Sequence, residues 1–309
     1  MKPIIFSGSS SPKLCQEIAR KNDFALGKLV RQDFANSEIK VRIETEVRNK
    51  DTIVVQGLSN PANDNLVELL FTVDALRREG AKSVTLVIPY FGYARQNIQH
   101  TKGECVSMNV VVRMLESLKV DKVITLDIHD EGSSGIFNIP FSNTSALPLL
   151  AKYIYKFYNL DKTTESQFVI GSPDQGGVER ARFFADNFYY LHKNTETIVV
   201  EKKRDLSRLH VSTAVEIFGN VKNKKVLLVD DIATSGSTII NAANMCLENG
   251  AVEVSTAIVH PDFALGVAKK LEDSRLTHFF TTNSIEKPIE DLSNYSKIKI
   301  IDIASVFRF

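Results

Sequence analysis

The stretch from Val226 to Thr238 constrains the fold of this chain more than any other. It begins with an apolar run, residues 226–229, whose branched side chains suit a strand buried on both faces, as parallel strands of α/β proteins are. Two adjacent carboxylates, Asp230 and Asp231, follow the run, and small residues lead into a helical pattern over residues 239–249. A strand, a polar loop and a helix in this order predict one βα unit of a mainly parallel sheet.

Strand and helix patterns alternate along both halves of the chain. The apolar strand patterns lie at residues 4–6, 52–56, 84–88, 122–126, 168–170, 197–200, 252–259, 279–281 and 298–301. Residues 26–32 are predicted to form a further strand, and the period-2 alternation over residues 39–43 predicts an antiparallel hairpin with one wet face. We therefore expect an α/β fold of two similar domains, each a mainly parallel sheet flanked by helices.

The length of the chain also favours two domains. Its 309 residues are enough for two units with separate hydrophobic cores. Small and polar residues at 142–146, just before Pro148, mark the expected boundary. We predict domains at residues 1–146 and 147–309, with the last roughly 15 residues packing on the N-terminal domain.

Charge and composition exclude several classes of protein. The 38 basic and 37 acidic side chains give a net charge of +1, which offers no basic face for nucleic acid. No apolar run approaches the roughly 18 residues of a membrane-spanning helix, and the first residues lack the apolar core of a signal peptide. The cysteines at positions 15, 105 and 246 form no CxxC pair, which favours reduced thiols over disulfides or a zinc site. We expect a cytoplasmic protein that binds neither membrane nor nucleic acid.

Reactive-looking side chains follow four of the predicted strands. In an open parallel sheet, ligands bind beyond the carboxyl ends of the strands, so these residues are expected to form one site. They are Arg95 with Gln96, His129 with Asp130, Asp174, and Asp230 with Asp231.

The residues after the Asp230–Asp231 pair predict a phosphate-binding loop. Small side chains at this point would direct free backbone N–H groups and hydroxyls of a helix start towards one ligand. With two carboxylates beside it, such a loop suits a sugar phosphate, because carboxylates bind vicinal hydroxyls or a metal. The same pattern also occurs where an acidic or hydroxyl side chain merely caps the next helix. The loop residues are Thr234, Ser235, Gly236, Ser237 and Thr238.

Three further motifs admit both a functional and a structural interpretation. Gly176 and Gly177 would let backbone N–H groups approach phosphate oxygens beside Asp174, a carboxylate suited to Mg²⁺, although Gly-Gly turns are common. His129 could contact a ligand or be a half-buried structural histidine. The cationic stretch Lys202-Lys203-Arg204 is either a solvated surface loop or a mobile flap that closes over phosphates.

Missing motifs narrow the choice of enzyme class. The sequence has no GxxxxGK[ST], no HRD or DFG set and no Rossmann GxGxxG. P-loop NTPases, protein kinases and dinucleotide oxidoreductases therefore lose their main support.

The motifs together resemble those of a known family. The segment 229–238 resembles the ribose-5-phosphate loop shared by phosphoribosyltransferases and ribose-phosphate pyrophosphokinases. Four other segments resemble motifs of the pyrophosphokinases: Phe34-Ala35-Asn36-Ser37-Glu38, Pro89-Tyr90-Phe91-Gly92-Tyr93-Ala94-Arg95-Gln96, Ser172-Pro173-Asp174-Gln175-Gly176-Gly177 and Lys202-Lys203-Arg204. The similarity extends from about Ile4 to Ile303, in register.

The resemblance implies an enzyme that transfers the β,γ-diphosphoryl group of ATP to the C1 hydroxyl of ribose 5-phosphate. It implies two phosphoribosyltransferase-type domains, and a homo-oligomer whose dimer units usually build hexamers. The implied Mg²⁺ ligands are His129 and Asp174, and the implied sugar-phosphate contacts are Asp230, Asp231 and residues 234–238. The implied ATP contacts are Arg95 and Gln96 for the phosphates, and Phe34, Asn36 and Glu38, from a neighbouring subunit, for the base.

The resemblance also assigns catalytic roles. Lys202 and Arg204 would stabilise the transition state over the leaving AMP and the β-phosphate, and His129 would contact magnesium or phosphate. Geometry and neutralised charge, more than covalent catalysis, are what such a transfer requires.

The chain departs from the family pattern at several positions. Asp130 follows His129 where a small residue is usual, and Thr234 stands where many bacterial members have Asp. After Arg95-Gln96, where Asp and basic residues are usual, this chain has Asn97-Ile98-Gln99. These departures bear on nucleotide affinity and on regulation by phosphate or ADP.

Two alternative functions remain compatible with the sequence. A phosphoribosyltransferase would use the same 229–238 loop, but Lys202, Arg204 and the Arg95-Gln96 loop argue against it. A non-catalytic regulatory paralogue that assembles with an active synthase is favoured by Asn97. Release of AMP from ATP and ribose 5-phosphate separates these readings from the pyrophosphokinase.

Overall fold

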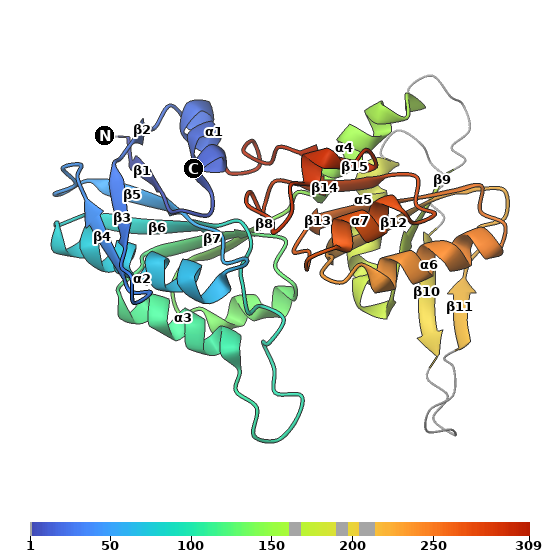
Figure 1. Cartoon of the computed structure of the whole chain (residues 1–309), viewed down its shortest axis with the longest axis horizontal. Helices are drawn as coiled ribbons and strands as arrows, with labels where there is room; N and C mark the ends of the chain where they lie inside the picture. The colour runs from blue at the N-terminus through green and yellow to red at the C-terminus, as the bar shows by residue number, and fades with distance from the viewer. Residues whose placement is uncertain (1, 161–167, 190–196, 204–213) are drawn as a thin grey trace. The chain divides into compact units, whose positions relative to one another are not determined.

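The computed structural model describes residues 2–160, 168–189, 197–203 and 214–309 (Figure 1). These residues form two compact units. Unit 1 runs to Ser145 and also includes Asn283–Pro288 and Asp302–Phe309, whereas unit 2 contains Ala146–Thr282 and Ile289–Ile301. The last residues of the chain, Asp302–Phe309, thus belong to the N-terminal unit.

Unit 1 is built on a six-stranded parallel sheet in the order β2-β1-β5-β6-β7-β8. A separate antiparallel hairpin, β3–β4, accompanies this sheet. The elements are β1 (Ile4–Ser7), α1 (Pro12–Asn22), β2 (Ala25–Leu26), β3 (Leu29–Asp33), β4 (Ile39–Ile43), β5 (Asp51–Val55), α2 (Ala62–Arg78), β6 (Ser83–Ile88), α3 (Ser107–Ser117), β7 (Lys122–Leu126), the 3₁₀ helix η1 (Glu131–Ile136) and β8 (Phe141–Thr144).

Both faces of the unit 1 sheet are buried, as the apolar strand runs predict. Alternate strand residues such as Phe6, Val54 and Leu86 pack in one core cluster with apolar side chains of α2 and α3. The residues between them, including Ile5 and Ile53, are also buried, and α1 contacts β1 and β5. The amphipathic helices therefore cover the sheet through their apolar faces.

Unit 2 contains a seven-stranded sheet in the order β11-β10-β9-β12-β13-β14-β15, in which β11 is antiparallel to its neighbour. A core cluster buries one face beneath α6 and α7, while α5 contacts β9 and β12. The elements are α4 (Leu147–Phe157), β9 (Phe168–Ser172), η3 (Gln175–Gly177), α5 (Val178–Phe188), β10 (Thr197–Lys203), β11 (Ala214–Phe218), β12 (Lys225–Ile232), α6 (Ser237–Glu248), β13 (Glu253–His260), α7 (Val267–Glu272), β14 (Phe279–Thr282), η4 (Leu292–Asn294) and β15 (Ile298–Ile301).

The two units share one topology, which confirms the predicted fold class. Reading along the chain, β1-α1-β2 and β5-α2-β6-α3-β7-β8 correspond to β9-α5-β10 and β12-α6-β13-α7-β14-β15. The strand orders match position by position, and unit 2 adds β11 at its edge. By this correspondence, β9 and β12 of unit 2 occupy the places of β1 and β5 in unit 1.

The structure differs from the predicted elements in two places that bear on function. The expected strand over residues 26–32 is two strands, because β2 ends at Leu26 and β3 begins at Leu29. Gly27, between them, packs so closely on the Phe6 ring that a Cβ atom there would lie 2.2 Å from it. The strand expected to end at Val229 continues to Ile232, because Asp230 and Ile232 pair with Ile258 and His260 of β13.

Candidate active site

The carboxylates of Asp230 and Asp231 share one guanidinium group at the end of β12. Arg180 Nη1, on α5, lies 2.7 Å from Asp230 Oδ1 and 3.2 Å from Asp231 Oδ1. The side chains of Asp230 and Asp231 are only 15% and 4% exposed. Burial, and next the charge of Asp231, raise the pKa of Asp230 to about 8, against the opposing effect of Arg180. The pair can therefore accept hydroxyl donors or a cation.

The turn after β9 lies against this acid pair. Asp174 Oδ1 accepts a hydrogen bond of 3.2 Å from the Gly177 N–H, and Ser172 Oγ donates to the Asp174 carbonyl at 2.5 Å. A Cβ atom on Gly177 would lie 2.6 Å from Ser172 Oγ and 3.3 Å from Asp230 Oδ1. Glycine at position 177 thus permits the close approach of this turn to Asp230. The structure brings together the two unit 2 motifs that the sequence predicted to share a site.

The loop between β12 and α6 places hydroxyl groups at the start of a helix. Gly236 adopts the left-handed conformation, with φ of 68°, just before Ser237, the first residue of α6. Ser235 Oγ accepts a hydrogen bond from the Ser237 N–H at 3.4 Å. The Ala264 N–H donates to the Thr234 carbonyl at 3.1 Å and fastens the loop to the segment before α7. The loop thus combines hydroxyl groups with the N-terminal end of a helix, a combination that suits an anion.

A lysine from α7 adds positive charge to this loop. Lys270 Nζ donates to Ser237 Oγ at 2.8 Å. Its neighbour Lys269 instead pairs with Asp273 at 2.6 Å. Lys270 therefore lies beside the 234–238 loop as a cation that could meet a phosphate.

In unit 1, the turns after β6 and β7 are joined by Asn97 and Asp130, two of the residues that depart from the family pattern. Asn97 Nδ2 donates to Asp130 Oδ2 at 2.5 Å and lies 3.3 Å from Ser133 Oγ. Asp130 Oδ1 also accepts from the Gly132 N–H at 2.9 Å. The Asn97–Asp130 contact therefore connects the loop of Arg95 and Gln96 to the turn of His129.

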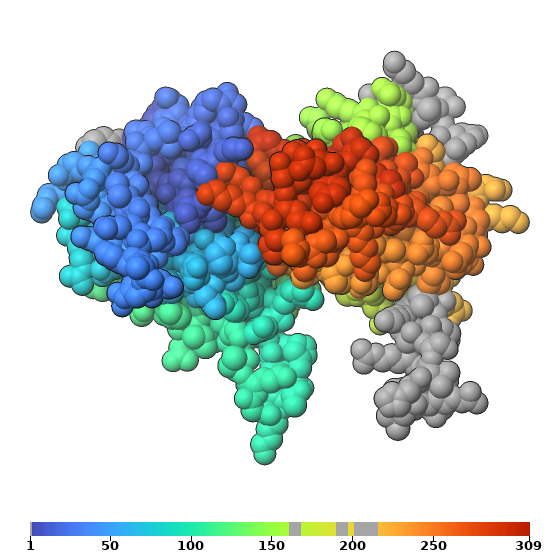
Figure 2. Space-filling model, viewed as in Figure 1, coloured from blue at the N-terminus to red at the C-terminus, as the bar shows by residue number. Residues whose placement is uncertain are grey.

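The loop of Arg95 and Gln96 is ordered by contacts with α3. Ser107 Oγ donates to Gln96 Oε1, and the Met108 N–H donates to the Gln96 carbonyl at 3.3 Å. Arg95, Gln96 and His129 are exposed. Part of the loop, drawn in teal, projects from the surface of unit 1 (Figure 2).

The hairpin tip is the third predicted element in unit 1. The Phe34 N–H donates to the Glu38 carbonyl at 2.9 Å, and the Glu38 N–H donates to Asn36 Oδ1 at 3.3 Å. These hydrogen bonds stay within the tip and leave Phe34, Asn36 and Glu38 exposed, with 42% of Phe34 accessible.

The predicted cationic flap is only partly within the described residues. Lys202 lies in β10, where its backbone pairs with Val215 of β11. The strand was expected to end at Val200, but antiparallel pairing with β11 extends it to Lys203. Arg204 lies outside the described residues.

Three further observations concern metal-binding groups, helix length and cysteines among the described residues. These residues contain no group of three or more His, Cys, Asp or Glu side chains placed to hold a metal ion. In the same part of the chain, no helix is both long and apolar enough to cross a bilayer. Cys15, Cys105 and Cys246 are free thiols, as expected, and burial raises the pKa of Cys15 and Cys246 to about 12.

Two site residues were missed from the sequence. Arg180 follows Gly177 by three positions, so the spacing within the first turn of α5 could have placed it near the loop. Lys270 is distant in sequence from the 234–238 loop, and no local pattern points to it.

Comparisons with known proteins agree with this architecture. Residues 3–118 match the model for the N-terminal domain of ribose phosphate pyrophosphokinase, and residues 143–290 match the phosphoribosyl transferase domain. The crystal structure of phosphoribosylpyrophosphate synthetase from Mycobacterium smegmatis superposes with a TM-score of 0.87 at 29% identity, covering 99% of this chain and 96% of that one. The fold and its loops are thus of the phosphoribosyltransferase type.

Curated sequences give the particular family. A ribose-phosphate pyrophosphokinase of Fusobacterium nucleatum is 36% identical over 304 residues, covering 98% of this chain and 92% of that protein. Another from Bradyrhizobium diazoefficiens is 38% identical over 302 residues, covering 98% and 91%. The chain belongs to the ribose-phosphate pyrophosphokinase family.

Proposed function

We propose that this protein is a ribose-phosphate diphosphokinase, which converts ATP and ribose 5-phosphate to phosphoribosyl pyrophosphate and AMP. The observation that carries the proposal is the buried Asp230–Asp231 pair, held by one guanidinium beside a serine-rich helix start, in a chain of this family. Two carboxylates share the single positive charge of Arg180, and the hydroxyls of a ribose can donate hydrogen bonds to them while its phosphate occupies the loop.

The proposed roles follow the motifs of each unit. Asp230, Asp231 and the loop Thr234, Ser235, Gly236, Ser237 and Thr238 bind ribose 5-phosphate, and the turn of Asp174, Gly176 and Gly177 binds the diphosphate. Arg95 and Gln96 bind the ATP phosphates, while Phe34, Asn36 and Glu38 bind the base. The exposed ring of Phe34 supports this last role, because a free aromatic face can stack on a nucleobase.

The reaction is a single displacement at phosphorus. The C1 hydroxyl oxygen of the sugar bonds to the β-phosphorus, and the bond from that phosphorus to the oxygen shared with the α-phosphorus breaks. AMP leaves with that oxygen, and the hydroxyl proton passes to water. Lys202 and Arg204 stabilise the charge that spreads over the transferred group, and the bound geometry supplies most of the remaining acceleration.

Magnesium suits the acids of unit 2. Burial and the neighbouring charge of Asp231 raise the pKa of Asp230, a bound cation would favour its charged form, and carboxylate oxygens are ligands that Mg²⁺ prefers. Asp174 and His129 would hold the ion, as the resemblance implies. When bound, it would neutralise phosphate charge on the nucleotide.

We further propose a cytoplasmic homo-oligomer made of dimer units, in which the hairpin tip serves a neighbouring subunit's site. The exposed tip supports a role in a neighbouring subunit. Among the described residues, the hydrogen bonds of Phe34, Asn36 and Glu38 are made within the tip itself. Free thiols at Cys15, Cys105 and Cys246 suit a reducing compartment.

The decisive experiment is an AMP-release assay with purified protein, Mg²⁺, ATP and ribose 5-phosphate. The wild type is expected to form AMP and phosphoribosyl pyrophosphate in equal amounts, and Lys202→Ala to lose turnover by about a hundredfold or more. No AMP at any phosphate concentration contradicts the proposal. Consumption of phosphoribosyl pyrophosphate with a free base would instead reveal a phosphoribosyltransferase, and activation of an active synthase would reveal a regulatory paralogue.

A further inference from the structure

The hairpin β3–β4 holds the proposed base-binding tip, yet little of it is buried. None of the residues in either strand is fully buried, and their contribution to the unit 1 core is limited to partly buried side chains such as Leu29 and Ile43. Apolar packing therefore contributes only modestly to fixing the hairpin against the rest of unit 1.

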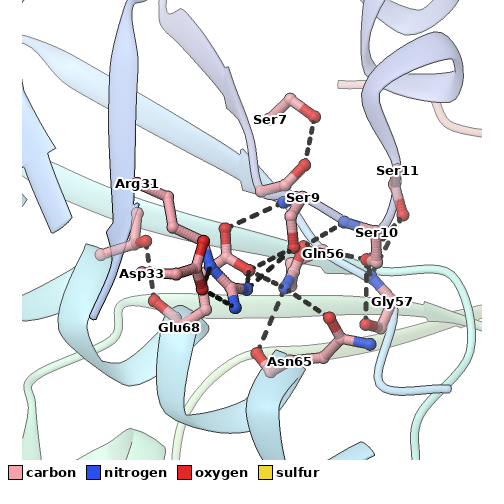
Figure 3. Close-up of polar contacts among 12 residues, drawn as sticks. Ser7, Ser9, Ser10, Ser11, Arg31, Asp33, Gln56, Gly57, Asn65 and Glu68 are labelled. Carbon is pink, nitrogen blue, oxygen red and sulfur yellow. Dashed lines mark hydrogen bonds and ion pairs between the residues drawn. The ribbon is translucent and has the colours of Figure 1, made fainter. Parts of the chain in front are cut away.

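Polar contacts of Glu68, a buried carboxylate on α2, also connect the hairpin to unit 1. Glu68 is 1% exposed and accepts hydrogen bonds from the Ser9 N–H at 2.9 Å, from Ser9 Oγ, and from Gln56 Nε2 at 3.2 Å. Figure 3 shows these side chains converging on Glu68 from the loops after β1 and β5. Arg31, on β3, completes the set with its Nη1 atom 2.7 Å from Glu68 Oε2.

Arg31 links this buried group to the hairpin tip. Its Nε and Nη2 atoms lie 3.0 Å and 2.6 Å from Asp33 Oδ1, and Asp33 directly precedes Phe34. One guanidinium therefore bridges the body of unit 1 and the first residue before the tip (Figure 3). A planar fork of donors is suited to such a two-sided contact, whereas an ammonium group is not.

The other ion pairs of the hairpin stay within it. Glu44, on the chain segment after β4, pairs with Lys28 at 2.7 Å and also with Arg42. Neither pair reaches α2 or the loops after β1 and β5. Among the described residues, the Arg31–Glu68 contact is thus the ion pair that joins the hairpin to the body of unit 1.

We propose that Arg31 and Glu68 are positioning residues for nucleotide binding: the pair fixes where the 34–38 tip presents its ring and polar groups to the base. This inference rests on the proposed function, because the tip is assigned to the base there. A buried, charge-paired carboxylate holds its partner in one geometry, since leaving the carboxylate unpaired is costly. Loss of Arg31 should therefore loosen the tip without changing any group that touches ATP or the sugar.

Arg31→Ala and Arg42→Ala make a matched pair of variants. Each removes one arginine of the hairpin, Arg31 from β3 and Arg42 from β4. The two lie close in the β3–β4 register, because Arg42 is the partner of Val30, the residue before Arg31. Arg31→Ala is expected to raise KM for ATP about tenfold, with KM for ribose 5-phosphate unchanged and kcat at saturation close to that of wild type. Arg42→Ala should leave all three parameters near wild type. Equal effects from the two variants, or a fall in kcat with KM for ATP unchanged, would overturn the proposal.

A double variant tests whether Arg31 acts through the tip. If Phe34→Ala already removes the base contact, then Arg31→Ala added to it should raise KM for ATP little further. Additive effects would show that Arg31 does not work through Phe34. Should Arg31→Ala fail to fold, Glu68→Gln, which removes the charge but keeps the shape, is expected to give the same KM pattern to a smaller degree.

Hydrogen exchange separates failure of this inference from failure of the proposed function. The Phe34 and Ser37 amides are hydrogen-bonded within the tip, to the Glu38 and Phe34 carbonyls. They should exchange faster in Arg31→Ala than in Arg42→Ala, in protein without ligand. If the wild type releases no AMP but this difference is found, the link between Arg31 and the tip stands while the enzyme assignment falls. Equal exchange in the two variants overturns the link itself.

Discussion

The two units share a topology, but the ends of two corresponding pairs of strands differ. In unit 2 the ends of β9 and β12 carry acidic side chains, whereas in unit 1 the loops after β1 and β5 are hydrogen-bonded to each other. In unit 2, the loop after β9 presents Asp174 and the end of β12 presents Asp230 and Asp231, and burial raises the pKa of Asp230 to about 8. In unit 1, the loops after β1 and β5 bond to each other: Gln56 Oε1 accepts from Ser10 N and Ser10 Oγ at 3.1 Å and 2.9 Å. The two units thus share a strand and helix plan but differ in the polar side chains that they place at these strand ends.

The first helix of each unit shows the same contrast. The start of α1 is occupied by the chain itself, because the Lys13 and Leu14 N–H groups donate to the two carboxylate oxygens of Glu286 at 2.9 Å and 2.8 Å. The start of α5 is preceded by Gly176 and Gly177, with a backbone suited to close approach. In unit 1, a glutamate of the protein thus occupies the helix start that corresponds to the proposed diphosphate position in unit 2.

The largest effect is expected where the two units differ most, at the ends of β12 and β5. Asp231→Asn should lower kcat/KM by about a hundredfold or more while leaving the free energy of unfolding near that of wild type. Gln56→Ala, directly after β5, should instead lower that free energy by about 2 kcal/mol, because it removes a buried amide with several partners. Steady-state kinetics and urea unfolding measure the two. An inactive but fully stable Gln56→Ala would place a second ligand site in unit 1.

A smaller effect is expected from restoring the family's usual residue at position 97. Asn97→Asp would set two carboxylates against each other at the contact with Asp130, now 2.5 Å, and push apart the turns that follow β6 and β7. We expect KM for ATP to rise about tenfold, by displacement of Arg95 and Gln96.

The double variant Asn97→Asp with Asp130→Asn exchanges the two groups and provides the control. It should return KM for ATP to within about threefold of the wild-type value, since one amide again faces one carboxylate. A single Asn97→Asp variant that binds ATP as well as wild type would show that this contact does not position the loop.

The sequence predicted the βα plan of both units because buried parallel strands leave a dense apolar signature. It also predicted the unit 2 motifs, because acid pairs and small residues at a strand end are local patterns. The spacing from Gly177 could have placed Arg180 near the loop, but not its pairing with Asp230 and Asp231. Lys270 could not be found at all, since its contact depends on how α7 packs. Nor could the sequence show that Asn97 and Asp130, 33 positions apart, are in contact.

The pH dependence of stability tests whether the buried Asp230 of unit 2 is the group whose ionisation destabilises the folded state. The pKa of Asp230 is raised from 3.8 to about 8, so its protonated form favours the folded state. This contribution is complete below about pH 4 and is lost as the pH rises through about 8. Asp230→Asn lacks the titration, so its Tm should exceed that of wild type by about 5 °C at pH 9 and match it near pH 4.

The measurement is calorimetry without ligand, in a buffer free of phosphate. Asp230→Asn should also lower activity, because a charged group that destabilises the folded protein can still be required for binding the substrate. A Tm difference that stays constant from pH 4 to pH 9 would show that Asp230 is not the group whose ionisation destabilises unit 2.

The smallest effect concerns the cation that unit 2 adds to its loop. Lys270→Ala removes the ammonium group 2.8 Å from Ser237 Oγ, at the proposed position of the sugar's phosphate. Because the lysine is exposed, we expect KM for ribose 5-phosphate to rise only about threefold to fivefold, with KM for ATP unchanged. The effect should shrink as salt is added. Lys269→Ala, which removes the adjacent lysine and its pair with Asp273, is the matched control and should leave KM for ribose 5-phosphate as it is. Equal shifts in both variants would mean that the general charge of α7, and not a contact with the loop, attracts the sugar phosphate.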